Sequence, residues 1–174
     1  MQNSQLKRFG LTPIGPKMRN LAFIFSFFLL LPAVSYAADD LDQLLQTYAV
    51  KTKTLEGATA TLVSDVQGSH NADEAATRIE SYAVVYHYVA ATFKDLMPAF
   101  LKAKTAGTLT TLERQSMIDS SQRMSEVGKV LTSESDAFDS ALKPYQDAPR
   151  VSAAVTAFSN EGQALQAVAQ QYNK

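Results

Sequence analysis

Ser140 and Lys143 match the S-x-x-K spacing, in which a serine hydroxyl attacks a substrate and a lysine helps to activate it. That chemistry belongs to penicillin-recognising enzymes, and the S-D-N and K-T-G elements that accompany it there are missing from this sequence. Lys143 also stands at the end of an expected helix, where a cation interacts favourably with the helix dipole. The sequence therefore predicts no catalytic residues and a protein that is not an enzyme.

Two histidines, His70 and His87, are the candidate ligands for a metal or a haem iron. His70 lies in the predicted turn at 68–71 without a second histidine nearby, as a zinc site would need. His87 lies at the edge of an expected apolar helix face, but the chain has no C-x-x-C-H motif for haem attachment and no Glu-x-x-His pair for di-iron. We expect no metal and no cofactor. In the alternative hypothesis, the core carries a small ligand or haem close to His87, Tyr82 and Tyr86.

The stretch 82–93, with the sequence YAVVYHYVAATF, contains no charged residue. A helix at the protein surface normally has charged residues on the side that faces solvent. An uncharged stretch therefore raises the question of what covers that side. If Tyr82 and Tyr86 face inward, Val84 points to the opposite side, and tyrosine is well suited to binding because it adds contact area at little entropic cost. We predict a partner-binding patch with four members: Val84, His87, Tyr88 and Ala91.

A simpler interpretation of the same stretch is that this helix is more enclosed than its neighbours. Single exposed apolar residues are also common on protein surfaces and need no function. Both interpretations stay open at this stage.

The elements that would position these residues are helices, because apolar residues recur at spacings of three and four. We expect helices over 41–67, from the Asn71 cap to about 105, from Thr110 to Pro144, and from the Asp147 cap to about 172. Asn71 with Glu74, and Thr110 with Glu113, have capping-box spacing. The expected inward positions are Leu41, Leu45, Tyr48, Thr52, Leu55, Thr59, Leu62, Val66; Ala75, Ile79, Tyr82, Tyr86, Val89, Phe93, Leu96, Phe100; Met117, Met124, Val127, Leu131, Phe138, Leu142; and Val151, Val155, Phe158, Gly162, Leu165, Ala169, Tyr172.

Four helices with one apolar stripe each predict an all-α fold, a four-helix up-down-up-down bundle. We expect the second helix to be kinked or broken near Pro98, because proline removes a backbone donor and crowds the preceding turn. A bend is also expected in the serine-rich segment 132–135 of the third helix.

The first 37 residues have the organisation of a cleaved secretory signal peptide. Four basic residues precede an uncharged apolar run over 21–31, and the small residues Ser35 and Ala37 flank Tyr36. The run is shorter than the roughly 20 residues that span a membrane. We predict cleavage after Ala37, a single mature domain at 38–174, and a periplasmic location, with secretion outside the cell as an alternative. Met18 begins a compact signal of its own, so the start at Met1 or Met18 is open.

The mature chain would be acidic, because four of the 16 basic residues are removed and all 17 acidic ones stay, giving a net charge of −5. That charge argues against binding to nucleic acid or to an anionic membrane. The chain has no cysteine, which excludes disulfides and thiolate sites. We expect a protein that works through protein–protein contacts, by self-association or with another periplasmic protein, as an adaptor, a chaperone-like binder or an inhibitor of the immunity type.

Overall fold

The computed structural model describes residues 38–172, and these residues are almost entirely helical. The helices are α2 (Ala38–Gln67), α3 (Ala72–Ala106), α4 (Thr111–Ser133), α5 (Ser135–Leu142) and α6 (Pro149–Gln171), with a 3₁₀ turn, η4 (Lys143–Tyr145). No strand is present in this part of the chain, which confirms the all-α prediction. The predicted signal peptide at 1–37 and both candidate start residues lie outside the described residues.

The described residues contain five α-helices where four were expected, because the third one is divided at Glu134. Ser133 and Ser135 donate their hydroxyls to the carbonyl oxygens of Val130 and Thr132, at 3.0 Å in both cases. Such local side-chain bonds compete with the helical backbone pattern, which explains why the serine-rich segment bends the chain. The expected bend is therefore confirmed, and it is a break between two helices.

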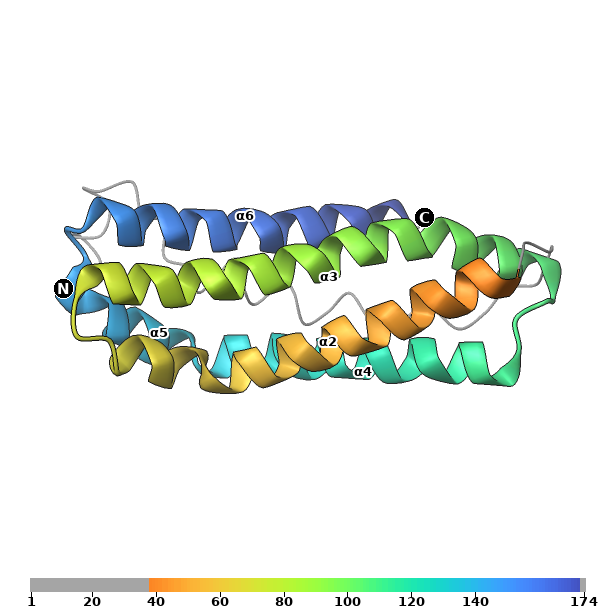
Figure 1. Cartoon of the computed structure of the whole chain (residues 1–174), viewed down its shortest axis with the longest axis horizontal. Coiled ribbons are helices and arrows are strands. Elements are labelled where there is room, and N and C mark those ends of the chain that lie inside the picture. Colours follow the sequence, from red (N-terminus) through yellow and green to blue (C-terminus); the bar gives the residue numbers. More distant parts are fainter. Residues whose placement is uncertain (1–37, 173–174) are drawn as a thin grey trace.

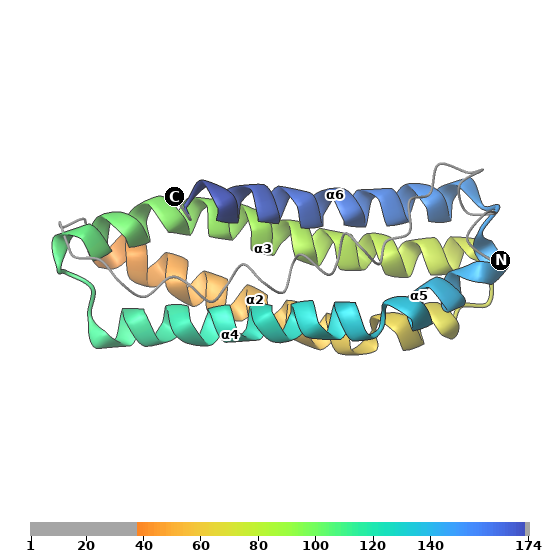
Figure 2. The ribbon, with the colours of Figure 1, turned by 180° about the vertical axis from the view of Figure 1, so that it is seen from behind.

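Successive helices run in opposite directions along a long, narrow molecule, with α5 continuing the direction of α4 (Figure 1). Side by side in the fold are α2 with α3, α2 with α4, and α3 with α6. The segment 107–110 carries the chain from the end of α3 across to α4, which packs against α2 rather than against α3 (Figure 2). As a result α3 has α2 on one flank and α6 on the other.

The helix α3 is continuous through Pro98, so of the two outcomes expected there, a kink or a break, the break is wrong. Both views show the axis of α3 curving over its C-terminal third, the part that contains Pro98 (Figures 1 and 2). Pro98 is exposed, so its ring lies on the solvent side and interrupts one backbone bond without disturbing the core. The helix ends at Gly107, whose φ of 64° lies in the left-handed region that favours glycine.

Of the three helix caps predicted, at Asn71, Thr110 and Asp147, the first two are formed. Asn71 accepts a hydrogen bond from Glu74 N at 2.9 Å, although the Glu74 carboxylate bonds to His70 N instead of to Asn71 N. Thr110 and Glu113 form the full capping box. Asp147 does not cap α6, because that helix begins one residue later, after Ala148, with no side-chain cap and with Pro149 in its first turn.

The core is a continuous apolar layer contributed by all five helices. Every inward position predicted for α2 and α3 is buried, and in the later helices only Leu142 and Tyr172 are partly exposed. The two threonines of the stripe are satisfied locally, because Thr52 and Thr59 donate to the carbonyl oxygens of Ala49 and Leu55. Helical periodicity alone thus located the core.

Candidate interaction surface on helix α3

The four residues of the predicted patch lie on the outward side of α3. Val84 and Tyr88 are 51% and 54% exposed, the His87 side chain is 57% exposed, and Ala91 is half-buried. The burial of Tyr82, Tyr86 and Val89 fixes the rotation of the helix, and this rotation turns Val84, His87 and Tyr88 outward. The structure therefore brings the four residues together on one surface, while binding to it stays a prediction.

A lysine from α2 borders the patch on one flank. Lys51 Nζ donates to Thr92 Oγ1 at 2.8 Å and lies 5.3 Å from the centre of the Tyr88 ring. At that distance the ammonium is attracted to the ring face. Thr92 in turn donates to the Tyr88 carbonyl oxygen at 2.8 Å. Tyr88 is consequently held in place although half of it is exposed.

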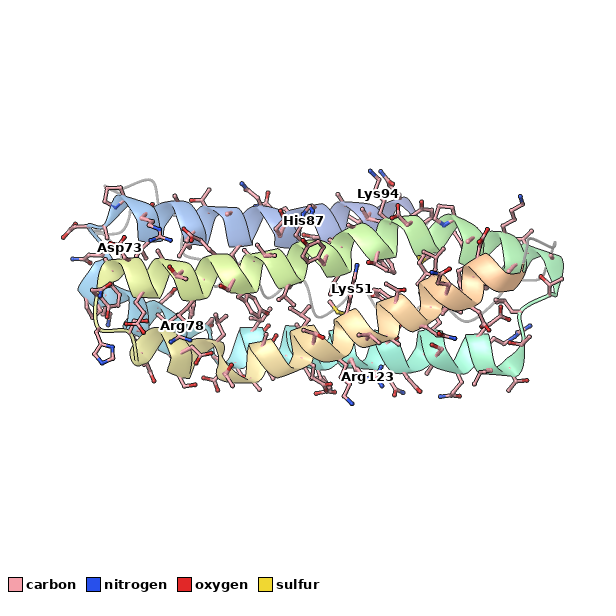
Figure 3. All side chains as sticks on the ribbon, viewed as in Figure 1. Lys51, Asp73, Arg78, His87, Lys94 and Arg123 are labelled. Atoms are coloured by element: carbon pink, nitrogen blue, oxygen red, sulfur yellow. The ribbon has the colours of Figure 1, made fainter. Side chains whose placement is uncertain are left out.

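A glutamate from α6 borders the patch on the other flank. His87 Nδ1 lies 3.0 Å from Glu161 Oε2, and the His87 ring meets the Tyr88 ring at an angle of 65° with centroids 5.9 Å apart. Figure 3 shows Lys51 reaching from α2 toward α3 on one side and His87 on the side of α6. The surface therefore spans three helices, with a cation at one border and a carboxylate at the other.

Charge returns at both ends of the uncharged stretch of α3. Toward the N-terminus, Arg150 of α6 donates to both carboxylate oxygens of Glu80 at 3.1 and 2.8 Å, to Asp73 at 3.3 Å and to Thr77 at 3.1 Å. The hydrogen bonds from Arg150 lower the pKa of Glu80, and the guanidinium offsets one of the two negative charges. Toward the C-terminus, Lys94 and Asp95 are both exposed.

Of the residues of the alternative ligand site, Tyr82 and Tyr86 lie together, with ring centroids 6.2 Å apart, and His87 lies away from them. Tyr82 and Tyr86 are buried in the core against Phe158, with ring centroids 5.0 and 5.9 Å from it, whereas His87 points outward. Burial raises the pKa of both tyrosines, so they are neutral. The Tyr82 hydroxyl already bonds to Thr59 Oγ1 at 2.8 Å. Two residues of this alternative site therefore lie in the packed core, and the third lies on the surface.

Three further features of residues 38–172 were candidates for a chemical site: a small hollow, the acidic and histidine side chains, and the pair Ser140 and Lys143. A small hollow beside the α4–α5 break is lined by Thr59, Val63, Leu131 and Phe138, and it has room for about one water molecule. No three acidic or histidine side chains of this part of the chain come close enough to hold a metal ion. Ser140 and Lys143 are both exposed on the surface.

Comparison of the chain with protein families, with curated proteins and with solved structures finds no match in any of the three. Within the described residues, every helix is too short or too polar to cross a membrane. The residues that border the patch, Lys51, Thr92 and Glu161, were missed by sequence reasoning. The sequence carried no signal for these borders, since the Thr92 hydroxyl already donates within α3 to the Tyr88 carbonyl oxygen.

Proposed function

We propose that the protein is an exported, non-enzymatic helical protein that acts in the periplasm by binding another protein through the outward face of α3. The binding patch consists of Val84, His87, Tyr88 and Ala91. An adaptor, a chaperone-like binder and an inhibitor of the immunity type are the functions that fit such a protein. The observation that supports this proposal is the group of exposed apolar and aromatic side chains at the middle of α3.

The surroundings of the patch suit a binding role better than accidental exposure. An isolated exposed apolar residue on a helix is ordinary, but here Val84 and Tyr88 are one turn apart. Lys51 and Glu161 hold the aromatic and histidine rings from both sides, so that little side-chain entropy would be lost when a partner binds. A preorganised aromatic patch with charged residues at its border resembles the centre and rim of protein interfaces in general.

We further propose that the fold is a four-helix up-down-up-down bundle. In it, α4 and α5 together take the place of one helix that is interrupted at Glu134. The two helices run in the same direction, and both pack against α2. In this arrangement α3 has its inward face in the core, and its outward face stays free for a partner.

The test of the binding function is affinity capture of the processed protein from the periplasm, with the wild-type chain compared with a V84D/Y88K variant. We expect the variant to lose the captured partner and to keep the helicity of the wild type in far-UV circular dichroism. The control is Leu112→Lys, because Leu112 is an apolar residue on α4 that lies outside the patch and is even more exposed, at 74%. Equal capture by the wild type and by both variants would refute the proposed site.

Export is tested separately. We expect cell fractionation to place the protein in the periplasm, and N-terminal sequencing of it to begin at Ala38. A protein that stays in the cytoplasm with residues 1–37 attached would overturn this part of the proposal.

A further inference from the structure

We propose that the segment 134–148, which contains α5 and η4, is a latch that opens as one unit while α2, α3, α4 and α6 stay folded. This latch segment lies at the end of the molecule where α2 ends and α6 begins (Figure 2). The inference goes beyond the proposed function and does not depend on the patch on α3. It follows from the weak attachment of the segment and the firm attachment of the helices around it.

The two ends of the latch segment lack the side-chain caps that α3 and α4 have at their starts. Glu134 separates α5 from α4 with φ of −92° and ψ of 1°, and among the described residues no side chain caps the start of α5. The start of α6, just after Ala148, is likewise without a side-chain cap in this part of the chain. Because the first N–H groups of an uncapped helix have no partner within it, these are points at which the chain opens at low cost.

The latch segment contributes little to the core. The buried side chains of α5 are Phe138 and Ala141, and those of η4 are all at least partly exposed. The packing beside Phe138 is also incomplete, because the hollow next to the α4–α5 break has room for about one water molecule. A segment with few buried apolar contacts has a low free energy of opening.

The charges of the latch segment oppose its docking. The segment has four acidic residues and one lysine. Asp139 on α5 is partly buried, and this burial, together with the nearby Asp136, raises the pKa of its carboxyl group against the opposite effect of Lys143. The folded protein therefore disfavours the ionised carboxylate of Asp139. The closed position of α5 is weakened as a result.

Two contacts with distant parts of the chain help to hold the latch segment closed. The Tyr145 hydroxyl donates to the Ser69 carbonyl oxygen at 2.6 Å, and so ties η4 to the turn between α2 and α3. The Phe138 ring meets the Phe158 ring of α6 with centroids 6.4 Å apart. Both contacts are broken when the segment opens.

The helices on both sides are held independently of the latch segment. The helix α4 begins with a capping box and has buried side chains along its length. The helix α6 is held on α3 by the ion pairs of Arg150 and by the contacts of Phe158 with two tyrosines. These contacts persist when 134–148 opens. Opening therefore uncovers buried apolar side chains beside the hollow, among them Leu62 of α2.

Hydrogen exchange of the processed protein, followed by mass spectrometry at increasing urea concentrations, measures this opening. We expect the amides of 134–148 to share one opening free energy that is lower than that of α3. It should also depend less on urea, because less surface becomes exposed. Exchange of the segment only together with α3 would overturn the proposal. Unrelated opening free energies along the segment, as in a fraying end, would overturn it as well.

Tyr145→Phe and Thr110→Ala form a matched pair of variants. Tyr145→Phe removes a hydrogen bond that only the closed segment makes, and should raise the opening constant of 134–148 by about fivefold to tenfold. Thr110→Ala removes a cap that stays formed when the segment opens. It should speed exchange of the α3 amides that open only by global unfolding, and leave the opening constant of 134–148 unchanged. If Thr110→Ala speeds exchange of both regions equally, the segment does not open independently and the proposal is wrong.

Asp139→Asn tests the charge on α5. This variant replaces the carboxylate by a neutral amide of similar shape, so at neutral pH it should lower the opening constant of 134–148 severalfold. Asp42→Asn is the control, because Asp42 is an exposed aspartate on α2 outside the latch segment, and it should leave the constant unchanged. The absence of a fall in Asp139→Asn, or an equal fall in Asp42→Asn, would contradict the role assigned to this charge.

Discussion

The Tyr82 ring on α3 and the Phe158 ring on α6 meet edge to face, with centroids 5.0 Å apart and planes at 80°. Phe158 also lies 5.9 Å from Tyr86 and 6.4 Å from Phe138 of α5. Edge-to-face contacts of this kind add to the free energy gained from burial. Phe158 therefore joins α6 to α3 and to α5.

The first prediction concerns this aromatic cluster. Phe158→Ala should lower the free energy of unfolding by about 3–5 kcal/mol, because it removes a buried ring and leaves a cavity between three helices. Urea unfolding followed by circular dichroism measures the change. Phe158→Leu is the control, and it should cost clearly less because it keeps part of the volume. A loss below about 1 kcal/mol for the alanine variant would contradict the packing described.

The second prediction compares two buried tyrosines. The Tyr48 hydroxyl has no hydrogen-bond partner among the described residues, whereas the Tyr82 hydroxyl bonds to Thr59. An unsatisfied buried hydroxyl destabilises the fold, so Tyr48→Phe should leave stability unchanged or raise it by about 1 kcal/mol. Tyr82→Phe should lower it by about 1 kcal/mol. The same urea titrations measure both variants, and the opposite order of their stabilities would show that the two hydroxyl environments are wrongly assigned.

The core could be predicted because it depends on a local property, the spacing of apolar residues along each helix. The outward direction of Val84 and Tyr88 could be predicted for the same reason, since it follows from the burial of Tyr82 and Tyr86. The break at Glu134 was also within reach, because serine hydroxyls bond to nearby carbonyl oxygens.

The borders of the patch could not be predicted, because they depend on which helices become neighbours and in which register. Lys51 and Thr92 are 41 residues apart, and His87 and Glu161 are 74 apart. Nothing in the sequence shows that α4 packs beside α2 and that α6 packs beside α3. The continuity of α3 through Pro98 was missed because the exposure of the ring at that position was unknown.

The third prediction concerns the start of α4. Thr110 accepts a hydrogen bond from Glu113 N at 3.1 Å, and the Glu113 carboxylate accepts one from Thr110 N. Thr110→Ala removes the first of these bonds and should lower the free energy of unfolding by about 1 kcal/mol. Thr110→Ser keeps the hydroxyl and should be close to the wild type. Equal losses in the two variants would indicate that the methyl group, not the cap, is what matters.

The last prediction is a pH dependence at the start of α3. Hydrogen bonds from the His70 backbone and ring and from Arg78 lower the pKa of Glu74 to about 2, although its surroundings are open to solvent. Because the folded-state pKa is lowered, Glu74 stabilises the fold above its ordinary pKa of about 4.5, and this contribution is lost as the pH falls toward 2.

Glu74→Gln should therefore be less stable than the wild type at neutral pH, and the difference should shrink steadily below pH 4.5. Urea unfolding at a series of pH values measures this difference. Glu56→Gln is the control, because Glu56 is an exposed glutamate on α2 that makes none of these contacts, and it is measured at the same pH values. A Glu74→Gln difference that does not change between pH 7 and pH 2 would show that the carboxylate is not held by its neighbours in the folded protein.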